Sequence, residues 1–99
     1  MKTDFTREAL DDLRRIEDHI AEDNPRRARR FVDELIDAAS AITGSPLAYP
    51  VVPRYADVGI RRRVYGRYLV FYRVEADRVT VIHILHGARD YDALLFPDG

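Results

Sequence analysis

The sequence predicts an α+β protein in which an N-terminal antiparallel helical hairpin packs on a small antiparallel sheet of three to four strands. Two long amphipathic segments fill the first half of the chain, and three runs rich in β-branched and aromatic residues fill the second half. Short polar joints connect the three runs, so neighbouring strands are expected to pair antiparallel. Residues 1–99 are expected to form a single domain, because 99 residues with 46% apolar content supply one hydrophobic core.

The hairpin is predicted by periodicity and by capping residues. The first helix is expected over residues 7–22, with Thr6 as its N-cap. Asn24 and Pro25 suit the cap and the first position of a second helix, which is expected to reach residue 42. Nearly all other positions of the first helix are charged, which predicts one buried stripe: Ala9, Leu10, Leu13, Ile16 and Ile20. Because the joint between the helices is short, they are expected to lie antiparallel.

Three strands are expected at Ile60–Val64, Tyr68–Val74 and Val79–Leu85, and the brief pattern of Lys2–Phe5 is compatible with an edge strand. Residues 43–57 hold three prolines and are expected to form an extended loop. Alternation places two sets of side chains on opposite faces of the sheet. The first set is Ile60, Arg62, Val64, Leu69, Phe71, Arg73, Thr80, Ile82 and Ile84; the second is Arg61, Arg63, Tyr68, Val70, Tyr72, Val79, Val81, His83 and Leu85. Both sets contain large apolar groups, so both faces are expected to be covered, although the hairpin supplies helices for only one.

The composition excludes several classes of protein. Without cysteine there is no disulfide and no thiolate metal site, and the three histidines are not grouped with carboxylates at ligand-like spacing, so no metal and no cofactor are expected. We expect a cytoplasmic protein with no membrane partner, because no signal-peptide pattern and no run of membrane-spanning length is visible. The net charge of −1 gives no bulk attraction for nucleic acid. All but one of the 16 basic residues are arginine, which favours planar pairing with carboxylate or phosphate.

Several motifs in succession resemble one family. The helical stretch DLRRIEDHIAEDNPRRARRFVDELIDA precedes an Ile-Arg-Arg strand, the run YLVFYRV and the closing HILHGARD. Over nearly the whole chain, this order and spacing resemble the RelE/ParE superfamily of bacterial toxins, and the ParE branch in particular. The resemblance implies the toxin of a type II toxin–antitoxin module, of the kind that stabilises plasmids. It also implies a cognate antitoxin that neutralises the toxin in a hetero-oligomer, as a heterotetramer or a larger complex.

The resemblance implies one of two activities, since ParE-like proteins poison DNA gyrase and RelE-like proteins cut mRNA in the ribosomal A site. RelE-like nucleases generally place an arginine where this chain has Leu69, and often a tyrosine or histidine where it has Leu95. An aliphatic pair supplies neither acid–base assistance nor charge stabilisation for RNA cleavage. The first hypothesis is therefore a gyrase-inhibiting binding protein with no catalytic residue. A ribosome-dependent mRNA endoribonuclease stays open as the alternative, because Arg62 could substitute, and direct nucleic-acid binding is expected only in that case. A degenerate member that retains only antitoxin binding is a third hypothesis.

The candidate binding residues fall into two groups. Those for the cellular target are Arg62, Arg67, Arg89 and Asp90. Arg89 follows Gly87 at the end of a strand and matches the arginine of the closing motif, although a structural pairing with Asp90 or Asp92 competes with this role. Those for the antitoxin are Arg61, Arg63, Leu69, Phe71, Ile82 and Ile84, which combine partners for acidic residues with apolar groups of one predicted face. For Arg61 and Arg63 a solvated edge strand is an equally weighted alternative.

The histidines are weak catalytic candidates. His83 alternates with Val81 and Leu85 and is therefore expected to be a satisfied packing residue. His86 belongs to the closing motif, but no serine or cysteine nucleophile is placed beside it.

Overall fold

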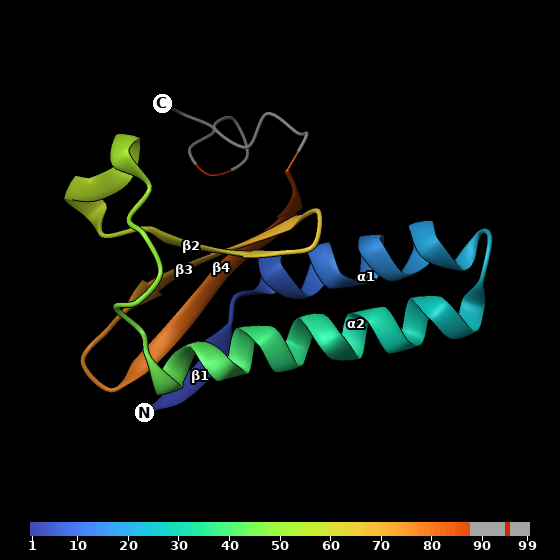
Figure 1. Ribbon diagram of the computed structural model, residues 1–99, viewed down its shortest axis with the longest axis horizontal. Helices are drawn as coiled ribbons and strands as arrows, with labels where there is room; N and C mark the ends of the chain where they lie inside the picture. The colour runs from blue at the N-terminus through green and yellow to red at the C-terminus, as the bar shows by residue number, and fades with distance from the viewer. Residues whose placement is uncertain (88–94, 96–99) are drawn as a thin grey trace.

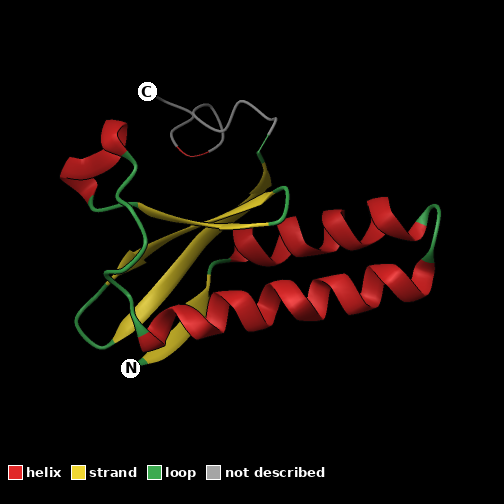
Figure 2. Ribbon diagram, viewed as in Figure 1, coloured by secondary structure: helices red, strands yellow, loops and turns green. Residues whose placement is uncertain are grey.

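A pair of helices lies against a four-stranded sheet in the computed structural model, which describes residues 1–87 and residue 95 (Figures 1 and 2). Along the chain the elements are β1 (Lys2–Phe5), α1 (Arg7–Ala21), α2 (Pro25–Ser40), the 3-10 helices η1 (Ala41–Gly44) and η2 (Pro53–Val58), β2 (Arg61–Tyr65), β3 (Tyr68–Val74) and β4 (Arg78–His86). The predicted α+β class and helical hairpin are confirmed. The tail after Gly87, apart from Leu95, lies outside the described residues.

The sheet has the strand order β1-β4-β3-β2 and is mixed. β2, β3 and β4 pair antiparallel in chain order, as predicted, whereas β1 pairs parallel with β4 from Lys2 opposite Arg78 to Phe5 opposite Val81. The start of β1 is further held by Arg78, whose guanidinium lies 2.6 Å from Asp4. The brief N-terminal pattern is therefore a strand, and its parallel partner is the last strand of the chain.

Both helices begin at the predicted capping residues. The side chain of Thr6 accepts a hydrogen bond from the backbone N–H of Ala9, and that of Asn24 accepts one from Arg27. The buried stripe of α1 differs from the prediction at two positions, because Leu10 is 45% exposed while Asp12 is only 2% exposed. The helix is thus rotated so that the carboxylate of Asp12, and not the side chain of Leu10, faces the sheet.

In this orientation α1 completes the edge of β4. β1 ends at Phe5, so the second half of β4 has no strand on that side, and α1 supplies hydrogen-bonding groups in its place. Thr6 donates its backbone N–H to the carbonyl of Val81 at 3.0 Å and its hydroxyl to the carbonyl of Ile82 at 2.9 Å. The backbone N–H of Ile84 donates to the buried carboxylate of Asp12 at 2.9 Å. Polar groups of a sheet edge that would otherwise be buried without partners are satisfied in this way.

An irregularity in the pairing of β3 with β4 corrects the predicted faces. Phe71 lies opposite His83, but the next residue, Tyr72, lies opposite Val81, so Ile82 is an extra residue in the ladder. Beyond this bulge, Ile84 and Leu85 lie on the faces opposite to those predicted. Ile84 was expected on the same face as Phe71 but packs in the core under the helices. Leu85 was expected on the other face but packs in one cluster with Phe71.

The sheet has a covered face on each side. The helices cover one face and form the main core with it: Ala9, Leu13, Ile16, Val32, Leu35, Ala39, Ile42, Val70, Tyr72, Val79, Val81 and Ile84. On the other face, which we call the outer face, a second buried cluster is formed by Val52, Tyr55, Ile60, Leu69, Phe71 and Leu85. The prediction that both faces are covered is therefore correct, and the proline-containing segment with η2 supplies the second cover.

The segment between α2 and β2 passes from one face of the sheet to the other around the β2 edge. Tyr49 packs edge-on against Tyr72 beside the main core, with ring centroids 6.4 Å apart, while Tyr55 belongs to the outer cluster. Between them Val51 bridges to Arg61 of β2. The hydroxyl of Tyr72 donates to the carbonyl of Pro46 at 2.6 Å, and burial raises the pKa of this tyrosine. The segment is thus held on both faces.

Candidate functional site

Arg61 and Arg63 lie on the helix-covered face and bind the backbone of the chain itself. Arg61 donates to the carbonyls of Tyr49 and Leu47, at 2.8 and 3.4 Å. Arg63 donates to the carbonyl of Ala38 at 2.6 Å and lies over the ring of Tyr49, 5.1 Å from its centroid. Ala38 belongs to the last turn of α2, where unpaired carbonyls favour a cation. Both side chains therefore tie the β2 edge to the hairpin and the loop.

Arg62 differs from its two neighbours because alternation places it on the outer face, opposite Phe71 in the β2–β3 ladder. Its Nε atom is buried and has no hydrogen-bond partner within the described residues. A buried guanidinium N–H without an acceptor is costly, since its hydration is lost and nothing replaces it. Among the described residues, Arg62 is the arginine of β2 with a buried donor that lacks an acceptor, and a bound partner would satisfy it.

Arg67 is exposed in the turn between β2 and β3 and adjoins the closing motif. Its carbonyl accepts a hydrogen bond of 2.8 Å from the backbone N–H of Gly87. This hydrogen bond holds the β2–β3 turn against the end of β4. The other two target-binding candidates, Arg89 and Asp90, lie outside the described residues.

The apolar candidates for antitoxin binding are mostly buried. Leu69 is 8% exposed, and Phe71 is fully buried in the outer cluster beneath the η2 segment. Ile84 is 1% exposed and lies in the main core. Its predicted position on the outer face was wrong, because the bulge at Ile82 reverses the alternation of side chains. Ile82 itself is half-buried against the outer cluster. Among these four residues, it alone has appreciable free surface.

A polar cluster that the sequence analysis did not single out joins α1 to β4. Nδ1 of His83 lies 2.7 Å from Oδ2 of Asp12, and Nη2 of Arg15 lies 2.8 Å from Oδ1. Burial raises the pKa of Asp12, but the hydrogen bonds from His83, the Ile84 N–H and Arg15 outweigh burial and hold the pKa below its ordinary value. The carboxylate therefore stays ionised and satisfied at the helix–sheet contact.

The spacing of Asp12 relative to the apolar stripe was a signal for this cluster. Asp12 follows Ala9 by three residues and precedes Ile16 by four, so it shares their helix face. A carboxylate on a buried face requires donors from the element packed against it. His83 fulfils the expectation of a satisfied packing histidine, with Asp12 as its partner.

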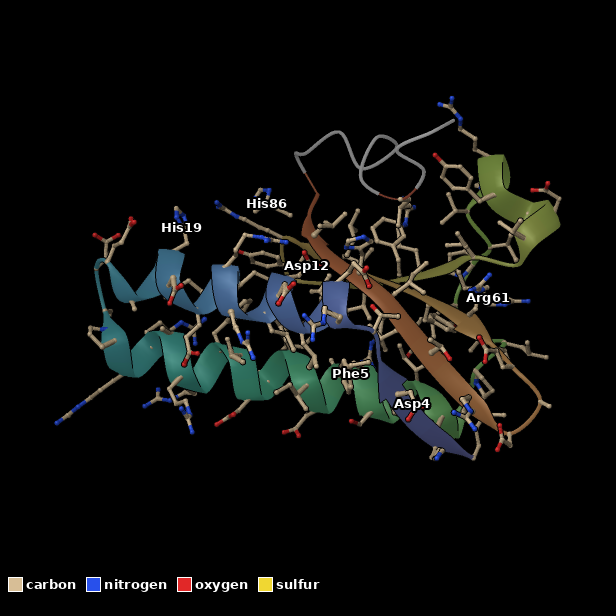
Figure 3. All side chains as sticks on the ribbon, turned by 180° about the vertical axis from the view of Figure 1, so that it is seen from behind. Asp4, Phe5, Asp12, His19, Arg61 and His86 are labelled. Carbon is tan, nitrogen blue, oxygen red and sulfur yellow. The ribbon has the colours of Figure 1, made fainter. Side chains whose placement is uncertain are left out.

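Two further histidines border this cluster. Figure 3 shows His19, from α1, and His86, from the end of β4, on the same side of the molecule as Asp12. The ring of His86 packs edge-on against Tyr68, with centroids 5.3 Å apart.

Within residues 1–87 and 95 no group of three or more histidines, cysteines or carboxylates could hold a metal ion. No helix in the described part of the chain is long and apolar enough to cross a membrane.

The comparisons with known proteins agree with the fold. A family model described as ParE toxin of type II toxin-antitoxin system, parDE, matches residues 4–91. Among solved structures, a chain of the chromosomal ParDE TA system from P. aeruginosa is similar, with a TM-score of 0.75 and 20% sequence identity. The alignment covers 87% of this chain and 95% of that one. The search of curated proteins found no match.

Proposed function

Because the chain belongs to the ParE toxin family of type II toxin–antitoxin systems, we propose that it acts by binding and inhibiting DNA gyrase and does not cut mRNA. Membership in this family implies a cognate ParD antitoxin as partner. The choice of gyrase rests on the resemblance to ParE-like proteins together with the chemistry of the outer face. A gyrase inhibitor acts in the cytoplasm, which suits a chain without cysteine.

The burial of Leu69 is the observation that carries the proposal. RelE-like nucleases generally have an arginine at this position, where its charge would stabilise the phosphorane formed during RNA cleavage. Here the leucine packs with Leu85 and Phe71 in the outer cluster. Loss of one charge-stabilising donor commonly lowers a rate by about 10²–10³. An apolar cluster at this place favours a surface that binds over one that catalyses.

Target binding is assigned in this proposal to Arg62 and Arg67, together with Arg89 and Asp90 of the closing motif. The buried Nε of Arg62 lacks a partner in the described structure, and Arg67 is exposed next to Gly87 of that motif. Carboxylates of the target would satisfy both guanidinium groups. Because Arg61 and Arg63 are occupied by backbone carbonyls, they contribute to this surface by holding β2 in place.

The antitoxin is proposed to cover the rim of the outer cluster in a hetero-oligomer, leaving Leu69 and Phe71 beneath it. Val64 is 59% exposed on β2 opposite Leu69, and the half-buried Ile82 flanks the cluster on β4. Val64→Asp should weaken antitoxin binding by at least about tenfold and leave thermal stability unchanged, since the side chain is exposed. Antitoxin affinity that is unaffected by Val64→Asp would place the antitoxin elsewhere.

Expression in a host without the antitoxin tests the choice of target. If the protein inhibits gyrase, its expression should induce a DNA-damage response before protein synthesis falls, because poisoned gyrase leaves broken DNA. Arg62→Met should reduce both the damage response and the toxicity. Immediate translational arrest with codon-dependent mRNA cleavage, and no DNA damage, would instead favour the endoribonuclease.

A further inference from the structure

A cavity of about 370 Å³ opens between α1 and the adjoining ends of β3 and β4, on the face of the sheet that the helices cover. It lies where β1 has ended and α1 has taken its place beside β4. Small-molecule sites typically begin at about 300 Å³, so the cavity is large enough for a compact ligand. Neither gyrase inhibition nor antitoxin binding, as proposed above, uses it.

The inner surface of the cavity is apolar and aromatic. Ile16 of α1 and Ile84 of β4, both of the main core, line the cavity together with Tyr68 of β3. Leu85 borders the cavity at the end of β4, although its side chain packs in the outer cluster. Ile84 and Leu85 are almost fully buried, and Tyr68 is fixed between Phe31, at 5.4 Å, and His86, at 5.3 Å, measured between ring centroids. A rigid aromatic wall over an aliphatic floor suits a flat, largely apolar ring system.

The rim of the cavity carries cationic and hydrogen-bonding groups on one helix face. Arg15 and His19 are four residues apart on α1, so their side chains project in the same direction. The guanidinium of Arg15 is held at 2.8 Å by the buried Asp12 carboxylate, yet the side chain remains 64% exposed. Arginine has five N–H donors, and this pairing uses one of them; the imidazole of His19 offers a donor in either protonation state. The rim is thus an oriented pair of donors for an anion.

Asp12 is the one carboxylate among the lining residues, and its charge is already countered. One oxygen accepts from Arg15, and the other accepts from His83 and from the backbone N–H of Ile84. The carboxylate therefore orients the guanidinium without leaving an oxygen unpaired at the cavity.

From this arrangement we infer that the cavity binds a free mononucleotide. The base lies between Tyr68 and the aliphatic floor, and the phosphate takes the donors of Arg15 and His19. A planar guanidinium suits phosphate oxygens, and stacking on an aromatic ring tolerates any base. The site would be separate from the outer face to which target binding is assigned.

The test is an NMR titration of the ¹⁵N-labelled full-length chain with adenosine 5′-monophosphate, inorganic phosphate, adenosine and N-acetylglutamate. Adenosine 5′-monophosphate should give saturable shifts of the backbone amides of Arg15, His19 and Leu85, at lower concentration than phosphate or adenosine. Arg15→Gln should weaken its binding by about tenfold. The matched control is Arg14→Gln, since Arg14 precedes Arg15 on the same helix, is 78% exposed and lies beside Asp11 outside the cavity. Its effect should be within about twofold.

Three results would overturn the inference. The first is the absence of saturable shifts at these amides up to about 10 mM adenosine 5′-monophosphate. The second is an equal response to N-acetylglutamate, which would assign the cavity to an acidic protein segment. The third is an equal loss of adenosine and adenosine 5′-monophosphate binding in Arg15→Gln, which would mean that Arg15 only shapes the cavity through Asp12. His19→Gln, which leaves the Asp12 contacts intact, should weaken the nucleotide and spare adenosine.

Discussion

Asp12 and His83 are separated by 71 positions in the sequence, and their side chains meet with 2.7 Å between Oδ2 and Nδ1. The contact joins the first helix to the last strand at the place where the sheet loses its edge strand. The same carboxylate oxygen accepts the backbone N–H of Ile84, so one side chain completes both a side-chain pair and a strand edge.

Asp12→Asn should lower the free energy of unfolding by about 1.5–3 kcal/mol, the usual worth of hydrogen bonds to a buried charged group. The asparagine would turn an N–H₂ group toward Arg15 or His83, both of which donate. Urea denaturation would measure the loss. Asp11→Asn, at a neighbouring position whose side chain is 45% exposed, is the control and should change stability by less than about 0.5 kcal/mol. Equal losses of unfolding free energy in the two variants would show that the contacts of Asp12 do not stabilise the fold.

The same carboxylate should make stability depend on acid. The pKa of Asp12 in the folded chain lies below its ordinary value of 3.8, so the unfolded chain takes up the proton first as pH falls. The stabilisation is present above about pH 4 and is lost as pH falls through the folded-state pKa. The stability gap between the wild type and Asp12→Asn should therefore shrink below about pH 4. A gap that stays constant down to about pH 2 would contradict the lowered pKa.

Arg63→Gln should lower the free energy of unfolding by about 1–3 kcal/mol, because it removes the hydrogen bond to the last turn of α2 and the packing on Tyr49. Arg67→Gln, in the exposed turn two residues beyond the end of β2, should stay within about 0.5 kcal/mol. Thermal denaturation of both variants would distinguish a structural arginine from a surface one. Unchanged stability of Arg63→Gln with weaker antitoxin binding would restore Arg63 as an antitoxin contact.

Leu69→Ala should cost about 2–5 kcal/mol, as expected for a leucine that is only 8% exposed. Val64→Ala is the matched control, because Val64 lies opposite Leu69 in the β2–β3 ladder and is 59% exposed. Its effect should be below about 0.5 kcal/mol. A small cost for Leu69→Ala would mean that the outer face is open, as a catalytic surface would be.

Arg62→Met should leave thermal stability unchanged or raise it slightly, since the change removes a buried N–H that has no partner in the described structure. The methionine fills a similar space without a polar atom. Growth inhibition by the expressed protein should nevertheless fall, because Arg62 is assigned to the target surface. A marked loss of stability would show that Arg62 supports the fold instead.

The sequence predicts the layers of this fold well because periodicity and capping are local signals. Thr6 and Asn24 cap the helices as expected, and β2, β3 and β4 pair in chain order. The N-terminal strand was weakly marked, because a four-residue strand has little pattern of its own and is stabilised by pairing with the distant β4. Its parallel direction depends on that tertiary contact.

The errors at the candidate site come from non-local effects. A single bulge at Ile82 moved Ile84 into the main core, and strict alternation has no means of signalling an inserted residue. The sequence around Arg61 and Arg63 did not indicate that their guanidinium groups would donate hydrogen bonds to backbone carbonyls of the loop and of α2. Arg89 and Asp90 remain predictions, because they lie outside the described residues.

The most direct test of the central claim is a supercoiling assay with purified DNA gyrase, relaxed plasmid and the purified protein. The proposal predicts that the protein stops negative supercoiling or accumulates cleaved DNA, that Arg62→Met does so less effectively, and that the cognate antitoxin restores the reaction. Undisturbed supercoiling at an excess of active protein, with codon-dependent cleavage of ribosome-bound mRNA by the same preparation, would contradict it.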